Sequence, residues 1–206
     1  MINTADLYDF SHSIAGSWLA GFSYPWQALG QIKSRILELG SQLDDSYVET
    51  APQVWVHKTA KIAPTAFLGA PCIIGPETEV RHCAFIRGSA LVILFDNVQV
   101  PHFNYVGDSI LGYKSHMGAG SVTSNVKSDK TLVVVKNGAE QMPTGLKKFG
   151  AMLGDFVEVG CNSVLNPGTV IGRRSNIYPT SCVRGVVPEN SIWKTGGVVV
   201  AKRTEA

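Results

Sequence analysis

Charged side chains are scarce in this sequence. Asp, Glu, Lys and Arg make up 17% of the 206 residues, whereas about a quarter is usual for a globular protein. The formal net charge of +2 is too small to favour binding to nucleic acid. Glycine is frequent instead, with 21 residues, so we expect many short strands and tight corners rather than a bundle of solvated helices.

Long apolar segments and paired cysteines are also missing. The longest apolar run, residues 90–95, is too short to cross a bilayer. The first residues, MINTADLYDFSHS, lack the basic and apolar segments of a secretory signal. The four cysteines show no CxxC spacing and are too sparse for a disulfide scaffold. We therefore expect a cytoplasmic protein with free thiols and no membrane partner.

A six-residue repeat dominates the sequence. Aliphatic residues recur at every sixth position in a first run, Val56, Ile62, Leu68, Ile74, Val80, Ile86, Val92 and Val98. A second run contains Leu153, Val159, Leu165, Ile171, Ile177 and Val183, and Leu111 and Met117 continue the period between the runs. Four residues further on, the hexads of the first run carry small residues at Ala60, Ala66, Cys72, Thr78, Ala84 and Ala90.

This spacing fits neither a helix of 3.6 residues per turn nor a strictly alternating strand. It predicts a solenoid whose coil has three sides, each made of one hexad. The aliphatic residue points inward and stacks on that of the next coil, while the small residue fits a crowded corner. We therefore predict an all-β architecture, a parallel β-helix over residues 51–200, with backbone hydrogen bonds between successive coils.

Two segments lie outside the repeat. Residues 24–43 predict an amphipathic helix with Pro25 in its first turn, although Gly40 offers an earlier end. Residues 1–50 are therefore expected to form an N-terminal helical extension. Residues 124–150 break the period and predict an inserted loop, too long to fold on its own coil.

Residues able to carry chemistry gather where the first run falters. Pro101, His102, Asn104, Tyr105 and Asp108 come soon after Val98, and His116 and Asn125 follow. Glycines at positions 107, 112, 118 and 120 can expose backbone N–H groups to a ligand. A break in an otherwise regular repeat is where a functional site is expected.

Several segments carry a family resemblance: VPHFNYVGDS at 100–109, GAGSVTSN at 118–125, LKKFG at 146–150, LNPGT at 165–169 and Tyr24-Pro25-Trp26. Over residues 24–194 the chain is similar to the acetyltransferase half of bifunctional UDP-N-acetylglucosamine pyrophosphorylase/glucosamine-1-phosphate N-acetyltransferases. It also resembles archaeal sugar-phosphate nucleotidyltransferases with an acetyltransferase tail. The resemblance implies a left-handed β-helix that transfers acetyl from acetyl-CoA to an amino-sugar phosphate. It implies no metal, and a homotrimer with active sites between subunits.

The resemblance also implies roles for residues that contact the acceptor. His102 matches the base that takes a proton from the substrate ammonium, a step worth ~10²–10⁴ in rate. Tyr105 and Asn125 match positions that contact the sugar or its phosphate. Arg81 matches the arginine that holds the phosphate, where a guanidinium fork suits bidentate binding. Arg87 competes for that role because the coil between Arg81 and His102 is shorter than in the bacterial enzymes.

Other positions are matched more loosely. Lys130 corresponds to a loop lysine near the substrate, Ala119 leaves room for the pantetheine arm, and Lys194 is placed to meet a CoA phosphate. Val126 stands where bacterial relatives often carry an aromatic residue, which leaves the identity of the amino sugar open. No Gly-rich nucleotide motif opens the chain, so nucleotidyl transfer is not expected.

Two other functions remain open from the sequence. A γ-class carbonic anhydrase shares this fold and holds zinc with three histidines, for which His82, His102 and His116 are the candidates. Their spacings of twenty and fourteen residues do not match the H-x₄-H pair of that class. A non-catalytic module that binds a sugar nucleotide or assembles with a partner is the other alternative.

Overall fold

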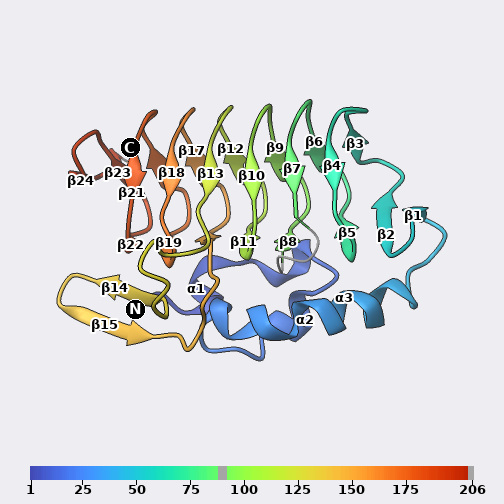
Figure 1. The fold of residues 1–206 in the computed structure, drawn as a ribbon, viewed down its shortest axis with the longest axis horizontal. Helices are drawn as coiled ribbons and strands as arrows, with labels where there is room; N and C mark the ends of the chain where they lie inside the picture. Colours follow the sequence, from blue (N-terminus) through green and yellow to red (C-terminus); the bar gives the residue numbers. More distant parts are fainter. Residues whose placement is uncertain (88–91, 204–206) are drawn as a thin grey trace.

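The computed structural model describes residues 1–87 and 92–203, and over these the chain forms a parallel β-helix with three faces (Figure 1). Face I contains β3 (Lys61–Ile62), β6 (Glu79–Val80), β9 (Gln99–Val100), β12 (His116–Met117), β17 (Glu158–Val159), β20 (Asn176–Ile177) and β23 (Ser191–Trp193), with the antiparallel β24 (Val199–Ala201) at its end. Face II contains β4 (Phe67–Leu68), β7 (Phe85–Ile86), β10 (Tyr105–Val106), β13 (Val122–Thr123), β18 (Val164–Leu165) and β21 (Cys182–Val183).

Face III is made of two sheets that follow one another along the prism. The first contains β1 (Tyr47–Ala51), β2 (Val54–His57) and β5 (Cys72–Ile74), with β1 antiparallel to β2. The second contains β8 (Val92–Leu94), β11 (Ser109–Leu111), β16 (Ala151–Leu153), β19 (Thr169–Ile171) and β22 (Val186–Val187). The predicted pairing of successive coils is therefore confirmed.

The repeat places its aliphatic residues inside the prism as predicted, except at one point. All six residues of the second run are buried, none more than 3% exposed. Val92 and Val98 do not take the stacked position of the repeat, because Leu94 pairs with Leu111 and Val100 pairs with Val80, although Val98 is itself fully buried. Val80 and Val100 are twenty residues apart, whereas the paired Ile62 and Val80 are eighteen apart. Two extra residues in this coil thus shift the phase of the repeat. Ala90, predicted as a small corner residue, lies outside the described residues.

The N-terminal extension is a series of short helices that lies along face III (Figure 1). These are α1 (Thr4–Leu7), the 3-10 helix η1 (Phe10–His12), α2 (Gly16–Leu19), the 3-10 helix η2 (Pro25–Gln31) and α3 (Ile32–Gly40). The predicted helix is thus divided in two and ends at Gly40. Its apolar side is buried at Trp26, Leu29, Ile32 and Ile36. No helix among the described residues is long and apolar enough to span a membrane.

The buried carboxylate of Asp155 ties the extension to the β-helix. Its oxygens accept hydrogen bonds from the backbone amides of Asp9 (2.7 Å) and Tyr113 (2.8 Å). Arg173 lies 3.0 Å from the same carboxylate and donates from Nε to the carbonyl oxygen of Leu7. Two backbone donors and one guanidinium therefore satisfy a carboxylate that is only 1% exposed.

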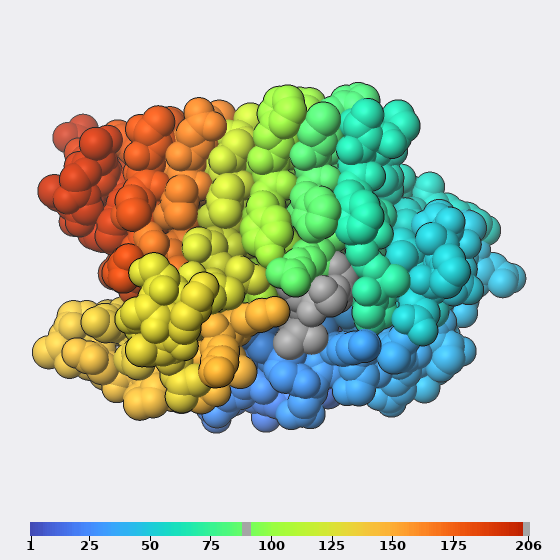
Figure 2. Space-filling view, viewed as in Figure 1, coloured from blue at the N-terminus to red at the C-terminus, as the bar shows by residue number. Residues whose placement is uncertain are grey.

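The inserted segment forms a β-hairpin of β14 (Val134–Asn137) and β15 (Glu140–Pro143). Val133, Val135 and Phe149 are fully buried, so the insert packs on its own β-helix. The expectation that it is too long to do so is wrong, because alternate apolar residues of β14 give the hairpin a buried side. Figure 2 shows the hairpin as the yellow-to-gold part of the surface beside the orange coils.

Candidate functional site

His102 lies in the corner where face I turns into face II. Hydrogen bonds join this corner from coil to coil: Phe103 N donates to His82 O, Gly120 N to His102 O, Asn162 N to Ala119 O, and Thr180 N to Cys161 O. The second residue of each turn has a positive φ, for example 61° at Phe103 and 73° at Gly120. We call the column His82, His102, Ala119, Cys161 and Pro179 the His102 corner. Two predicted site residues, His102 and Ala119, are therefore neighbours.

The imidazole of His102 is half-buried and stands beside that of His82. The ring centroids are 6.3 Å apart and the planes are inclined by 11°. Nδ1 of His82 lies 2.9 Å from Oγ1 of Thr65, whereas no hydrogen bond to the His102 imidazole is formed by another described residue. His102 thus keeps both ring nitrogens available to a ligand.

Tyr105, Asp108 and Asn125 form a second group, which we call the Tyr105 group, on the side of face II that adjoins face III. The amide of Asn125 donates to the carboxylate of Asp108 and lies 3.4 Å from the Tyr105 hydroxyl. Asp108 is 2% exposed, and burial raises the pKa of its carboxyl, opposed by the Asn125 hydrogen bond and by the charges of Lys148 and Arg87. Tyr105 and Asn125, both of which the resemblance matches to the acceptor site, thus lie together.

Arg87, rather than Arg81, belongs to this group. A hydrogen bond to Tyr105 raises the pKa of the Arg87 guanidinium. Arg81 instead donates to the carboxylate of Glu79 from Nε (3.0 Å) and Nη2 (2.8 Å). The structure therefore favours the alternative arginine, because the longer coil between Val80 and Val100 brings residue 87 beside Gly107.

The two lysines matched by the resemblance, Lys130 and Lys194, do not lie next to His102. Lys194 follows β23 and lies in the coil after Tyr178, since Tyr178 N donates to Trp193 O. It therefore continues the His102 corner about four coils beyond His102, roughly 19 Å at the usual strand spacing. Lys130 is exposed in a turn of the insert, where its amide donates to Lys127 O.

His116 is separated from the other two histidines of the zinc hypothesis. Its Nδ1 lies 2.8 Å from the carboxylate of Glu158 on the outer side of face I. Among residues 1–87 and 92–203, no group of three or more His, Cys, Asp or Glu side chains has the arrangement of a metal site.

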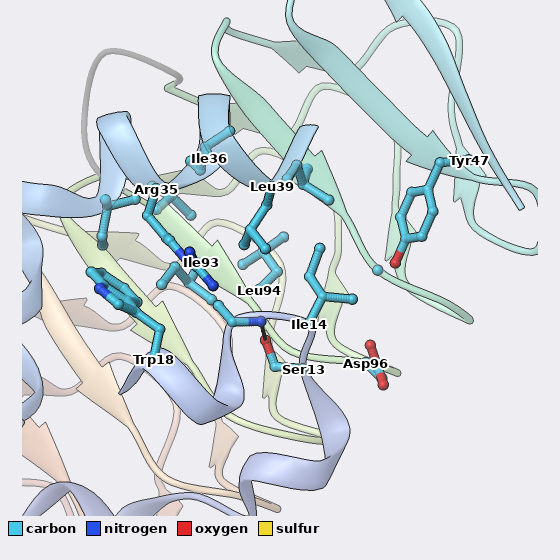
Figure 3. Close-up of a pocket in the computed structure, with 15 residues that line it drawn as sticks. Ser13, Ile14, Trp18, Arg35, Ile36, Leu39, Tyr47, Ile93, Leu94 and Asp96 are labelled. Carbon is cyan, nitrogen blue, oxygen red and sulfur yellow. Dashed lines mark hydrogen bonds between the residues drawn. The ribbon is translucent and has the colours of Figure 1, made fainter. Parts of the chain in front are cut away.

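An apolar gap lies between the helices and face III, and it is too small to be a ligand-binding site. Figure 3 shows Trp18, Ile36, Leu39, Ile93 and Leu94 around it. Its volume of about 30 Å³ accommodates about one water molecule. Pockets that hold small ligands are about ten times larger.

Comparisons with known proteins identify relatives of this chain. A family profile described as the GMPPB C-terminal domain matches residues 50–139. The bifunctional protein GlmU of Methanococcus vannielii is 30% identical over 145 residues, which cover 70% of this chain and 34% of that protein. A bifunctional sugar-1-phosphate nucleotidylyltransferase/acetyltransferase of Sulfurisphaera tokodaii is 31% identical over 121 residues, covering 59% of this chain and 28% of the relative. The chain thus spans about a third of the length of these relatives.

A solved structure shows the same fold. The hexapeptide transferase family protein from Anaplasma phagocytophilum superposes with a TM-score of 0.54 at 16% identity, covering 74% of this chain and 81% of that chain. Over 70% of its length the chain is thus similar to a third of a bifunctional GlmU protein, and its fold is that of a hexapeptide transferase family protein. The predicted left-handed β-helix and the resemblance are confirmed.

Two contacts beside Asn125 were not predicted from the sequence. The carboxylate of Asp108 accepts a hydrogen bond from the amide of Asn125. Lys148, in the LKKFG segment, acts electrostatically on Asp108. Lys148 lies near Asp108 because the chain returns there from the insert to the β-helix. At this point the backbone amide of Gly150 donates to the carbonyl oxygen of Asp108 at 2.7 Å.

Proposed function

We propose that this chain is an acetyl-CoA-dependent N-acetyltransferase that acts on an amino-sugar phosphate. The observation that carries the proposal is the position of His102, a half-buried imidazole with no hydrogen-bonded side-chain partner among the described residues, directly beside the small residue Ala119. A base with an unoccupied ring nitrogen beside a small residue suits attack on a thioester.

His102 takes a proton from the ammonium group of the acceptor in this mechanism. The amine nitrogen then forms a bond to the carbonyl carbon of the thioester, and the carbon–sulfur bond breaks. The departing sulfur of CoA receives the proton from the imidazolium, which regenerates the base, and the second proton that the nitrogen loses as the amide forms passes to solvent. Proton transfer by a positioned imidazole is worth ~10²–10⁴ in rate.

The two substrates occupy different parts of the chain in this proposal. The pantetheine arm of acetyl-CoA follows the His102 corner past Ala119 toward Lys194, where the lysine meets a phosphate of CoA. The amino sugar lies over face II, with Tyr105, Asn125 and Arg87 around it. The amide of Asn125 and the hydroxyl of Tyr105 are the polar groups that orient a sugar there.

The active form is a homotrimer with sites between neighbouring prisms. Face II carries a column of stacked aromatic rings, with centroids 4.6 Å apart for Phe67 and Phe85 and 6.0 Å apart for Phe85 and Tyr105. Phe67 is 52% and Phe85 40% exposed. A contiguous apolar strip of this kind favours contact with another protein surface.

An assay of CoA thiol release tests the proposed reaction. The protein is given acetyl-CoA with glucosamine 1-phosphate, galactosamine 1-phosphate and a nucleotide-linked amino sugar, each against the same sugar without its amine. We expect release with at least one amine and none without it. No release from any acceptor, together with thermal stabilisation by UDP-sugars alone, would instead identify a binding module.

A further inference from the structure

A polar hollow lies between the inserted hairpin and the corner where face II turns into face III. It has a volume of about 530 Å³, within the range of sites that hold small organic ligands. Ser124 and Val126 line one side, Lys127 and Lys136 come from the insert, and Arg184 comes from the coil after β21. None of the residues predicted to bind substrate or CoA lines this hollow.

The hollow carries an excess of positive charge. Its basic side chains are Lys127, Lys136 and Arg184, and its carboxylate is that of Asp129. Asp129 is matched by Lys127, whose Nζ lies 3.2 Å from it. Lys136 and Arg184 make no ion pair with another described residue, and Arg184 donates only to Oδ1 of Asn166, at 3.3 Å. Two cations therefore face the hollow without a counter-charge.

The walls of the hollow are held in place by close backbone approaches. Gly185 has φ +81°, and a Cβ there would lie 2.6 Å from the carbonyl oxygen of Lys136. A Cβ on Gly168 would lie 2.8 Å from Cγ1 of Val133, which is itself fully buried. The hairpin is thus fitted to the β-helix at two glycines, and the two cations are presented by a preformed surface rather than by a free loop.

We infer that this hollow binds a phosphate or diphosphate group. Lys136 and Arg184 both line the hollow, and neither has a carboxylate partner among the described residues. An ammonium and a guanidinium group in one hollow favour the binding of a phosphate oxyanion. The volume exceeds that of a phosphate alone, so the ligand is an organic phosphate. Ser124 and Val126 flank Asn125, whose amide belongs to the Tyr105 group. The hollow is therefore a second anion site, apart from Arg87 of the Tyr105 group.

Calorimetric titration of the complete chain tests this site directly. The probes are inorganic phosphate, inorganic pyrophosphate and uridine diphosphate, each at two salt concentrations because screening weakens such contacts. The variants are Lys136→Gln and Arg184→Gln. Matched controls are Lys33→Gln on α3 and Arg174→Gln, both exposed and outside the hollow. We expect saturable binding of at least one probe, weakened tenfold or more in each hollow variant and less than twofold in each control.

The result separates this inference from the acetyl-transfer proposal. Absence of saturable binding, or equal weakening in the control variants, overturns the phosphate site whatever the enzyme activity. His102→Ala is expected to bind the probes like the wild type while losing thiol release. If a turnover assay finds that Arg184→Gln leaves the KM for the acceptor unchanged although probe binding is lost, the hollow binds phosphate but does not hold the acceptor.

Discussion

The backbone amide of Gly120 donates a 2.9 Å hydrogen bond to the carbonyl oxygen of His102. This bond fixes the height of one corner turn above the next, so that Ala119 stands beside the histidine. Glycine suits position 120 because a Cβ there would collide with Oδ1 of Asn162 in the following coil. The proposed base and the proposed CoA groove are thus parts of one stacked column.

Replacing His102 with alanine is expected to reduce thiol release by ~10²–10⁴. The fold should be kept, because the imidazole is half-buried and the described residues form no hydrogen bond with it, and a change at such a position costs within about 0.5 kcal/mol. The matched control is His116→Ala, which removes an imidazole paired with Glu158 and should keep most of the activity. Rates and urea midpoints are measured for both, and an active His102→Ala enzyme refutes the mechanism.

Replacing Asp155 with alanine should release the N-terminal extension. The amides of Asp9 and Tyr113 and the guanidinium of Arg173 would lose their acceptor, and breaking such a buried charged group costs about 3–5 kcal/mol. Urea unfolding reports the loss. Limited proteolysis should then cut within residues 1–23. Asp129→Ala, at an exposed surface pair, is the control and should change stability by at most about 1 kcal/mol. Equal stability of the two variants would disprove the clamp.

The contribution of Asp96 to stability should fall as the pH rises from about 4 to 6. Burial raises the pKa of Asp96 to about 6, with the charge of His12 acting in the opposite direction. In the unfolded chain the carboxyl titrates near ~3.9. The folded state therefore binds this proton more tightly, and the stabilisation present below pH ~3.9 is lost as the pH rises through the folded pKa. Figure 3 shows the carboxylate at the edge of the apolar gap.

Asp96→Asn is the variant that tests this titration. It keeps the shape of the side chain, so urea midpoints should decline less between pH 4 and 6 than in the wild type, and the variant should be more stable at pH 7. Asp129→Asn is the control, since hydrogen bonds from Thr131 lower the pKa of Asp129. Identical pH profiles for Asp96→Asn and the wild type would show that Asp96 does not titrate in this range.

The sequence predicts the solenoid well because every hexad has the same task. Each inward residue stacks on its equivalent in the next coil, so spacing alone identifies Leu153, Ile171 and Val183 as core. It failed at Val92 and Val98 because both are aliphatic and continue the period, although two extra residues in that coil place Leu94 and Val100 inward. Because Val92, Leu94, Val98 and Val100 are all aliphatic, the residue types do not show that the repeat shifts by two positions.

The candidate site was predictable to the same extent. Tyr105 and Asn125 were matched to the acceptor site by the family resemblance, and the structure brings the amide nitrogen of Asn125 to 3.4 Å from the Tyr105 hydroxyl. The choice between Arg81 and Arg87 depended on the length of one coil, which the repeat does not determine. The hollow beside the insert was not predictable, because Lys136 and Arg184 are brought together by a hairpin outside the repeat.

Light scattering should give a mass of three chains of 22.1 kDa for the wild type, and Phe85→Lys should reduce it to one. The reason is the exposed aromatic column on face II, where Phe85 lies between Phe67 and Tyr105. A lysine there would bring three like charges into an apolar contact, at a cost that association does not recover. Val48→Lys, at an exposed apolar residue of β1, is the control and should remain trimeric.

A wild type that is monomeric at micromolar concentration would contradict the proposed trimer. A trimeric Phe85→Lys variant would assign the contact to another face. If monomeric Phe85→Lys also loses thiol release while His102 is intact, the active site is shared between subunits.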